Sequence, residues 1–259
     1  MNEPDFYREY YEKLHSVERK LTPKEESRIK NTIAFIPEDV ESLLEVGCGD
    51  GRIVNRLKGK YEEICGLDIS NKALDYVETP KVQGTLENLP FADNSFDIVI
   101  CCEVLEHLPY SVYKKAVKEM ERVSKKYILI SVPNNENLER EMITCPECGC
   151  SSHLWRHLRS FNEERLRNLF KDFEIHKIKT HSSEQFMFAG TFFKIKRFLN
   201  INQRFPQTAL CPQCGYSPEY EAKSAHLKKE NKGINLLKKV LPLKKAGGWI
   251  IVLYKCSGS

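Results

Sequence analysis

The chain has 259 residues, of which 41% are hydrophobic and 29% are charged. This length is enough for one large α/β domain or two small ones, and the composition is that of a folded protein with a core. No apolar run approaches the roughly 18 residues of a membrane-spanning helix, and the acidic start, residues 1–6, lacks the apolar stretch of a signal peptide. We therefore expect a cytoplasmic protein that does not contact membranes, whose ten cysteines are reduced thiols and metal ligands.

The charge of the chain is divided unevenly between its two halves. Residues 1–134 carry 19 Lys and Arg against 24 Asp and Glu, whereas residues 135–259 carry 21 against 12. The net charge of the whole chain is only +4. A basic half is typical of a protein that binds an anionic partner, and it is also typical of a lysine-rich surface that faces only water. Both interpretations stay open.

Two helices are expected in the N-terminal region, residues 1–40, at about 4–19 and 23–35. The second follows Thr22 and Pro23, and Glu25 lies three residues after Thr22. A Thr followed three residues later by Glu forms a capping box, and Pro is favoured in the first turn of a helix.

From residue 42 onward, strand-like and helix-like segments alternate, which predicts an α/β fold with a doubly wound, mostly parallel sheet and helices on both faces. The expected strands are 42–46, 63–67, 81–83, 96–102, 127–132, 174–180 and 249–254, and the expected helices are 52–57, 71–77, 111–124 and 162–173. Two irregular stretches, 134–157 and 182–246, interrupt this alternation as insertions in a single domain, 1–259.

The first expected strand runs into a glycine-rich turn. The sequence Leu-Leu-Glu-Val-Gly-Cys-Gly-Asp-Gly-Arg spans residues 43–52, with glycines at 47, 49 and 51. A strand, a glycine turn and a helix N-terminus form a cradle for a nucleotide-like ligand. The spacing differs from the dinucleotide pattern Gly-x-Gly-x-x-Gly, because Arg52 takes the place of the last glycine, and the acid Glu45 precedes the first.

The pattern Glu45-x-Gly47-x-Gly49-x-Gly51 resembles the first motif of class I S-adenosylmethionine (SAM) methyltransferases. The segment from Gly84 to Asp97, which contains Leu-Pro-Phe-Ala-Asp, is similar to later segments of the same family. The resemblance covers residues 40–133 closely, and 158–180 and 247–256 by element order alone. It implies a Rossmann-like sheet of seven strands whose last strand is antiparallel, with SAM as cofactor.

Asp68 ends the second expected strand, 21 residues after Gly47. An acid there can accept both hydrogen bonds of a ribose diol, or it can cap the helix expected at 71–77. By the resemblance, Ile69, Thr85 and Leu86 surround the adenine, and Cys102 lies near the methionine part of SAM. The expected cofactor site therefore comprises Glu45, Gly47, Cys48, Gly49, Asp68, Ile69, Thr85, Leu86 and Cys102.

Three candidate catalytic residues, Glu103, Glu106 and His107, follow the fourth expected strand, where ligands bind in a doubly wound sheet. In one interpretation they begin a helix beside the acceptor, and His107 orients it or acts as a base. In the other, the segment is similar to ubiquinone-biosynthesis O-methyltransferases and small-RNA 3′-terminal 2′-O-methyltransferases. There the matching residues hold a divalent cation, which here would be Mg²⁺ or Mn²⁺, with His153 or His157 as a further match.

Two sequences of the form Cys-Pro-x-Cys-Gly occur, one in each insertion, and are typical of zinc knuckles. Together they offer the four thiols of a tetrahedral structural zinc site, Cys145, Cys148, Cys211 and Cys214. In the alternative, His153 or His157 is a zinc ligand in place of one cysteine. Because the insertions follow the fifth and sixth strands, both leave the sheet at its C-terminal face. We expect a zinc lid above the cofactor.

The expected function is SAM-dependent transfer of a methyl group to oxygen or nitrogen of a small-molecule or sugar-type acceptor, which the basic half would suit if the acceptor is anionic. One alternative is a metal-assisted RNA methyltransferase that acts on a 2′-hydroxyl at an RNA end. The other is a non-catalytic adaptor with a methyltransferase fold.

Overall fold

The computed structural model describes residues 9–12, 20–181, 186–188, 205–206, 209–218, 243–245 and 248–258. Most of the helix expected at 4–19 and most of the insertion at 182–246 therefore lie outside the described residues. Residues 9–12 are helical, as expected for that segment.

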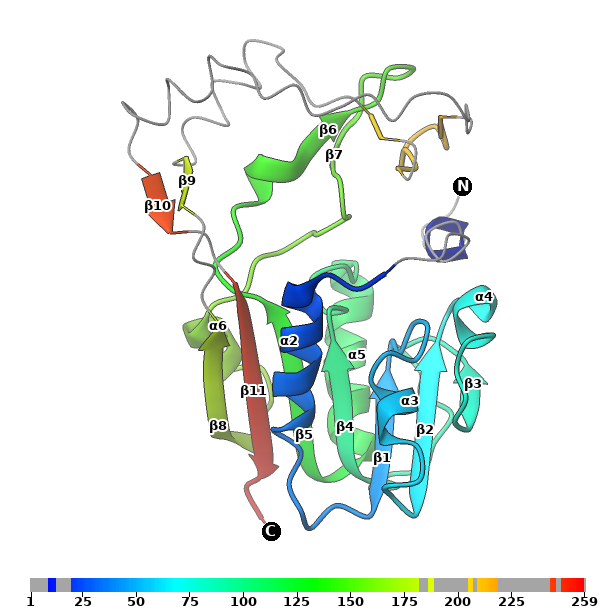
Figure 1. Ribbon diagram of the computed structural model, residues 1–259, viewed down its shortest axis with the longest axis vertical. Helices are drawn as coiled ribbons and strands as arrows, with labels where there is room; N and C mark the ends of the chain where they lie inside the picture. Colours follow the sequence, from blue (N-terminus) through cyan, green and yellow to red (C-terminus); the bar gives the residue numbers. More distant parts are fainter. Residues whose placement is uncertain are drawn as a thin grey trace.

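A seven-stranded sheet forms the body of the protein, in the order β3-β2-β1-β4-β5-β11-β8 (Figure 1). Its strands are β1 Ser42–Val46, β2 Glu63–Asp68, β3 Lys81–Gln83, β4 Phe96–Cys102, β5 Ser124–Pro133, β8 Phe173–His181 and β11 Trp249–Cys256. Strands β3, β2, β1, β4 and β5 pair in parallel, whereas β11 is antiparallel to both β5 and β8. The mostly parallel sheet and its antiparallel last strand are confirmed.

Helices cover both faces of the sheet, and each face has its own hydrophobic core. The helices are α2 Pro23–Ile33, α3 Val54–Leu57, α4 Asn71–Leu74, α5 Tyr110–Val123 and α6 Glu163–Arg167, with a short 3₁₀ turn η1 at Leu138–Glu141. One core contains Ile29 of α2, Val54 of α3 and Leu74 of α4. The other contains Met120 of α5 and Leu166 of α6. This three-layer arrangement is the one predicted from the alternation of elements.

The strands agree closely with the sequence predictions, but three helices are shorter than expected. The helix expected at 52–57 begins at Val54, the one expected at 71–77 ends at Leu74, and the one expected at 162–173 ends at Arg167. In the last case the apolar residues continue, but Phe170 and Phe173 are both buried in the core beside β11. The chain therefore leaves the helix to pack those rings and starts β8 at Phe173. The capping box of Thr22 and Glu25 is present as predicted.

Both insertions contain short hairpins that the sequence analysis did not predict. Strand β6, Met142–Thr144, pairs with β7, Ser151–His153, and β9, Phe186–Phe188, pairs with β10, Leu243–Lys245. The hairpin β6-β7 lies beyond the carboxyl ends of the parallel strands, on the side of the sheet where β1, β2, β4 and β5 end (Figure 1). The first insertion thus leaves the sheet at the expected edge.

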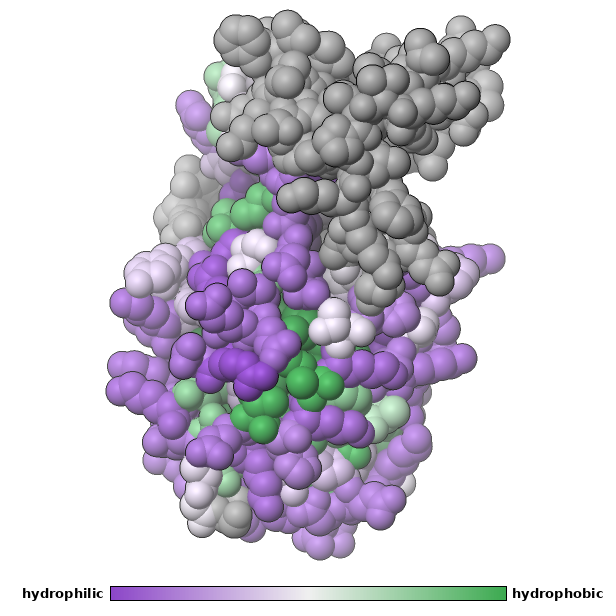
Figure 2. All heavy atoms as spheres, turned by 90° about the vertical axis from the view of Figure 1, so that its left-hand side faces the viewer, coloured by the Kyte–Doolittle hydropathy of each residue, from purple (hydrophilic) through white to green (hydrophobic). Residues whose placement is uncertain are grey.

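Strand β8 forms one edge of the sheet, and its outward side chains are polar. Glu174, His176, Lys177 and Lys179 are exposed, and charged edge residues discourage pairing with another chain. Seen from this side of the molecule, the surface is mainly hydrophilic, with an apolar area near its centre and smaller apolar areas elsewhere (Figure 2). Among the described residues, no helix combines the length and apolar character needed to cross a membrane.

The buried acid Glu45 joins strand β1 to the start of helix α3. Its side chain is 3% exposed, and Oε2 accepts a hydrogen bond from the Val54 amide at 3.1 Å. Such an amide has no partner within the helix, so the carboxylate satisfies it. Burial raises the pKa of Glu45 to about 8, although the Val54 amide opposes the rise. The acid therefore stabilises the turn while carrying a proton at neutral pH.

Glu45→Gln is expected to change how stability depends on pH. The pKa of Glu45 is about 8 in the folded state and roughly 4.3 when unfolded. The folded state therefore binds more protons in this window, and its stability falls as pH rises, by up to about 1.4 kcal/mol per pH unit. Glutamine still accepts the Val54 hydrogen bond but does not titrate. Urea unfolding at pH 5, 6.5 and 8 should show that the free energy of unfolding of the variant increases relative to that of the wild type as pH rises. The same pH dependence in both proteins would contradict this account.

Candidate functional site

The glycine turn after β1 lies against both neighbouring strands. The amides of Gly47 and Cys48 donate to the Leu67 carbonyl of β2 at 2.7 and 3.0 Å. Gly47 has φ of +69°, and a Cβ placed on it would lie 2.4 Å from Cγ2 of Val104, in the segment after β4. Both the backbone conformation and this close approach exclude a side chain here. The turn is thus enclosed between β2 and the segment that follows β4.

Asp68 connects the glycine turn to the end of β2. Its Oδ2 accepts from the Gly49 amide at 2.8 Å and its Oδ1 accepts from the Ser70 amide at 2.9 Å. The alternative role, capping of helix α4, is wrong: the Ser70 hydroxyl caps α4 by accepting from the Ala73 amide at 3.2 Å. Asp68 is 8% exposed, and an oxygen of an ionised carboxylate can accept more than one hydrogen bond.

A pocket of about 480 Å³ opens beside Asp68. This volume lies in the usual range for small-molecule sites. The pocket is lined by Glu12, Ile69, Asn71, Gln83, Gly84 and Thr85. Ile69 and Thr85 were predicted to lie at the cofactor. The other expected residues Leu86, Cys48 and Cys102 are buried in the cores of the sheet. Glu12 was not singled out, because nothing in the sequence shows that the N-terminal segment folds over this edge.

Glu103 directly follows β4 in a left-handed backbone conformation, with φ of +58°. Its Oε2 accepts from Nε1 of Trp249 at 2.7 Å, and its Oε1 lies 3.9 Å from Nη1 of Arg28. The Arg28 guanidinium also lies 5.7 Å from the Trp249 ring centroid. The sequence analysis identified neither Arg28 nor Trp249, since both come from segments distant in the chain. Together they hold Glu103 at the carboxyl end of β4.

The buried carboxylate of Glu106 has no hydrogen-bond partner among the described residues. It is 1% exposed, and neither carboxylate oxygen has a partner among the described residues. Burial raises its pKa well above the usual value, and Glu103 adds to the rise. Nε2 of the adjacent His107 lies 4.0 Å from Oε1 of Glu106, and burial holds the pKa of His107 well below its usual value. Burial therefore favours the uncharged form of both groups.

Three more polar residues complete this cluster. The ring of His157 lies 4.6 Å from that of His107, and its Nδ1 lies 2.5 Å from Oε2 of Glu136. His153 stacks on His157 at 4.7 Å, and its Nδ1 accepts the His157 backbone amide at 3.2 Å. Ligand atoms of Glu106, His107 and His157 all lie within 4.8 Å of one another. Glu136 was missed by the sequence analysis.

The segment that follows β7 holds this cluster in place through the backbone. The Leu158 amide donates to the Glu106 carbonyl at 2.7 Å, and the Arg159 guanidinium donates to the Leu105 carbonyl. Arg159 is 8% exposed and its charge lies over the Tyr113 ring. The first insertion therefore brings its histidines back to the carboxyl end of β4 before α6 begins.

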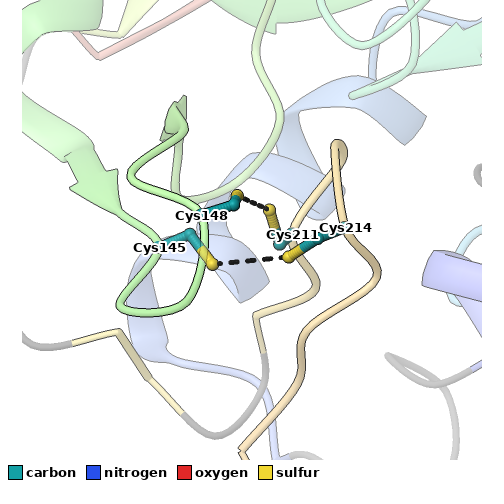
Figure 3. A group of neighbouring side chains, drawn as sticks. All are labelled: Cys145, Cys148, Cys211 and Cys214. Atoms are coloured by element: carbon teal, nitrogen blue, oxygen red, sulfur yellow. Dashed lines mark hydrogen bonds between the residues drawn. The ribbon is translucent and has the colours of Figure 1, made fainter.

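The four knuckle cysteines converge as predicted, two from each insertion (Figure 3). Sγ of Cys145 lies 3.7 Å from Sγ of Cys214, and Sγ of Cys148 lies 3.6 Å from Sγ of Cys211. Four thiolates around one Zn²⁺, each about 2.3 Å from the ion, are roughly 3.8 Å apart. The donor set and its spacing therefore fit a tetrahedral zinc ion. His153 and His157 lie in the cluster with Glu136 instead.

The two knuckles have the same backbone hydrogen bonds. The Gly149 amide donates to the Cys145 carbonyl and the Gly215 amide to the Cys211 carbonyl, both at 3.0 Å. These glycines have φ of +71° and +73°, and no atom lies within 4 Å of a Cβ built on either. Glycine is therefore required by the backbone conformation and not by crowding. Backbone amides of Cys214 and Gln213 counteract burial and lower the pKa of Cys211, which suits a thiolate ligand.

Comparison with known proteins agrees with this geometry. A family model described as a methyltransferase domain matches residues 44–129. An uncharacterised protein of Methanocaldococcus jannaschii is 32% identical over 160 residues, which are 59% of this chain and 61% of that protein. A ubiquinone biosynthesis O-methyltransferase of Albidiferax ferrireducens is 29% identical over 80 residues, 27% of this chain and 32% of the relative. The chain thus spans less than two thirds of the length of these relatives.

The fold is also similar to solved structures. A SAM-dependent methyltransferase of Thermotoga maritima, described as a possible histamine N-methyltransferase, is superimposed with a TM-score of 0.51 at 18% identity, covering 97% of this chain and 95% of that one. The family match includes the glycine turn, Asp68 and the segment of Glu103, Glu106 and His107. Residues 44–129 of the chain thus match a methyltransferase domain, and the chain has the fold of this solved SAM-dependent methyltransferase.

Proposed function

We propose that this protein transfers the methyl group of SAM to an oxygen or nitrogen of a small-molecule or sugar-type acceptor, beneath a lid held by structural zinc. The observation that carries the proposal is the order of sites along one edge of the sheet. The pocket beside Asp68 suits the adenosine part of SAM, and the Glu106–His107–His157 cluster lies at the end of β4. The knuckles, which come from insertions beyond that edge, lie above it (Figure 1).

Each part of the cofactor has a matching group in this proposal. The Asp68 carboxylate accepts hydrogen bonds from the ribose hydroxyls, and Ile69 and Thr85 line the adenine pocket. The glycine turn lets the backbone approach the cofactor. Glu103 and Arg28, which carry opposite charges, suit the ammonium and carboxylate groups of the methionine part.

Methyl transfer is an in-line displacement at the sulfonium methyl, so positioning of the acceptor supplies most of the rate enhancement, an effect that reaches roughly 7–11 kcal/mol. Burial lowers the pKa of His107, which favours the neutral imidazole that can take a proton from an acceptor hydroxyl or amine. Burial raises the pKa of Glu106, which favours the protonated acid that can donate a hydrogen bond to the same acceptor. An acceptor with its own negative charge would suit the basic second half of the chain.

Asp68→Ala is expected to weaken SAM binding at least about tenfold, because it removes charge-assisted hydrogen bonds of roughly 1.5–3 kcal/mol each. Asp75→Ala, which changes an exposed acid at the end of α4, is the control and should bind SAM as the wild type does. Calorimetric titration measures both. Unchanged affinity in Asp68→Ala would refute the ribose assignment.

The same pair of variants tests the activity. Labelled methyl transfer from SAM into host extract, separated into RNA, protein and small-molecule fractions, should label the small-molecule fraction with the wild type and Asp75→Ala but not with Asp68→Ala. Label in RNA would instead favour the 2′-hydroxyl of an RNA end as acceptor. SAM binding without label in any fraction would favour the non-catalytic adaptor.

Cys211→Ser is expected to lose zinc and to destabilise the protein, because coordination by a structural site contributes to folding. Cys150→Ser is the control: Cys150 lies in the first insertion, two residues after Cys148, but outside the four-cysteine group. Metal analysis of the purified variants should find one zinc per chain in Cys150→Ser and none in Cys211→Ser. Full zinc in Cys211→Ser would mean that the four cysteines do not share one ion.

Cation-assisted methyl transfer is the second candidate function, supported by the unpaired oxygens of buried Glu106 beside two imidazoles. Glu106, His107 and His157 would hold the cation, and Glu136 would fix the His157 ring. This donor set suits Mn²⁺ better than Mg²⁺. The cation would lower the pKa of an acceptor hydroxyl. Glu103 is less suited as a ligand than the resemblance implies, because Trp249 donates to its Oε2.

In this second candidate, the zinc-loaded protein should bind one Mn²⁺, detected by electron paramagnetic resonance, and His157→Ala should lose it. His176→Ala, which changes an exposed histidine on β8, should retain it. Equal Mn²⁺ binding by wild type and His157→Ala, or no binding by either, would leave His107 as the base without a cation.

A further inference from the structure

Residues 9–12 contact three parts of the protein that are distant from one another in the sequence. Tyr10 packs with Leu210, next to Cys211 of the second knuckle. The ring of Tyr11 lies 6.2 Å from that of His107, edge to face. Oε1 of Glu12 accepts from the Asn71 amide at 2.8 Å. We name residues 9–12 the N-terminal bridge.

The contact with the knuckle is a small apolar core of its own. Tyr10 and Leu210 are each 3% exposed, and together with Tyr11 they form a cluster separate from the two cores of the sheet. Cys211, which follows Leu210, is fully buried and donates its amide to the Tyr216 carbonyl at 2.8 Å. The position of Leu210 therefore depends on the closed knuckle, and the position of Tyr10 depends on Leu210.

The contact with the pocket is polar and lies at its rim. Glu12 lines the pocket together with Asn71 and Thr85, and its Oε2 lies 4.0 Å from Nζ of Lys72. Residues 9–12 thus contact the second knuckle through Tyr10 and the pocket through Glu12.

We propose that the N-terminal bridge couples the two sites, so that zinc in the knuckles and SAM in the pocket each raise the affinity for the other; the inference rests on the proposed function. Zinc fixes Leu210, Leu210 holds Tyr10, and Tyr10 places Glu12 on the pocket wall and Tyr11 beside His107. Loss of zinc would then weaken the cofactor site without any change in the sheet. Such coupling is reciprocal by thermodynamic necessity.

The test uses the zinc-loaded full chain and S-adenosylhomocysteine, the methyl-free product of SAM, as probe. Tyr10→Ala interrupts the bridge, Leu210→Ala interrupts it from the other side, and Glu9→Ala changes an exposed bridge residue as control. Zinc affinity is measured by competition with a chromogenic chelator, with and without saturating probe. The probe should raise zinc affinity about fivefold or more in the wild type and in Glu9→Ala, and leave it unchanged in Tyr10→Ala and Leu210→Ala.

Calorimetric titration of the zinc-loaded variants gives the second readout. Tyr10→Ala and Leu210→Ala should retain full zinc yet bind the probe about fivefold more weakly or worse. An equal effect of the probe on zinc affinity in wild type and Tyr10→Ala would overturn the coupling. A wild type that binds zinc but not the probe would refute the proposed function itself, whereas a wild type that binds both independently would refute only the bridge.

Discussion

The parallel pairing of β1 between β2 and β4 is the constraint on which the candidate site depends. In a parallel sheet the carboxyl ends of neighbouring strands lie at one edge, so the registers Val46 with Leu67 and Val46 with Cys101 bring three strand ends together. The glycine turn, Asp68 and Glu103 follow those ends. The Leu67 carbonyl closes the arrangement, because it accepts both amides of the turn.

The polar groups at this edge are poorly satisfied compared with the rest of the protein. Most buried polar atoms in folded proteins have hydrogen-bond partners, and exceptions require an explanation. Both oxygens of Glu106 and Nδ1 of His107 are exceptions within the described chain. A protein built for stability alone would replace them with apolar side chains. Their retention at the ends of the strands, next to Glu136 and His157, is what a bound ligand or acceptor would explain.

Local patterns in the sequence predicted what depends on neighbouring residues. The strands follow from runs of apolar residues. The glycine turn follows from glycines, which tolerate positive φ angles, and the knuckles follow from the spacing of their cysteine ligands. The structure contains all three. The helix expected at 162–173 ended at Arg167 because burial of Phe170 and Phe173 outweighed its helical pattern. Arg28, Trp249, Glu136 and Glu12 were not identified, since their partners lie far away in the chain and only the fold brings them together. The convergence of the two knuckles could be predicted because each knuckle offers two thiols and a tetrahedral zinc site needs four ligands.

The cysteine knuckles lie in insertions that leave the sheet, where the sheet itself contributes little to fixing the conformation of the chain. The insertion after β5 must leave the sheet and return to α6, and on its return it binds the Glu106 and Leu105 carbonyls through Leu158 and Arg159. Such excursions cost conformational entropy, which a metal cross-link between distant segments reduces. A zinc ion held by the four cysteines would join this excursion to the segment of Leu210, against which Tyr10 packs. In the proposed coupling, such an ion would stabilise both walls of the site, the histidine cluster on one side and the N-terminal bridge on the other.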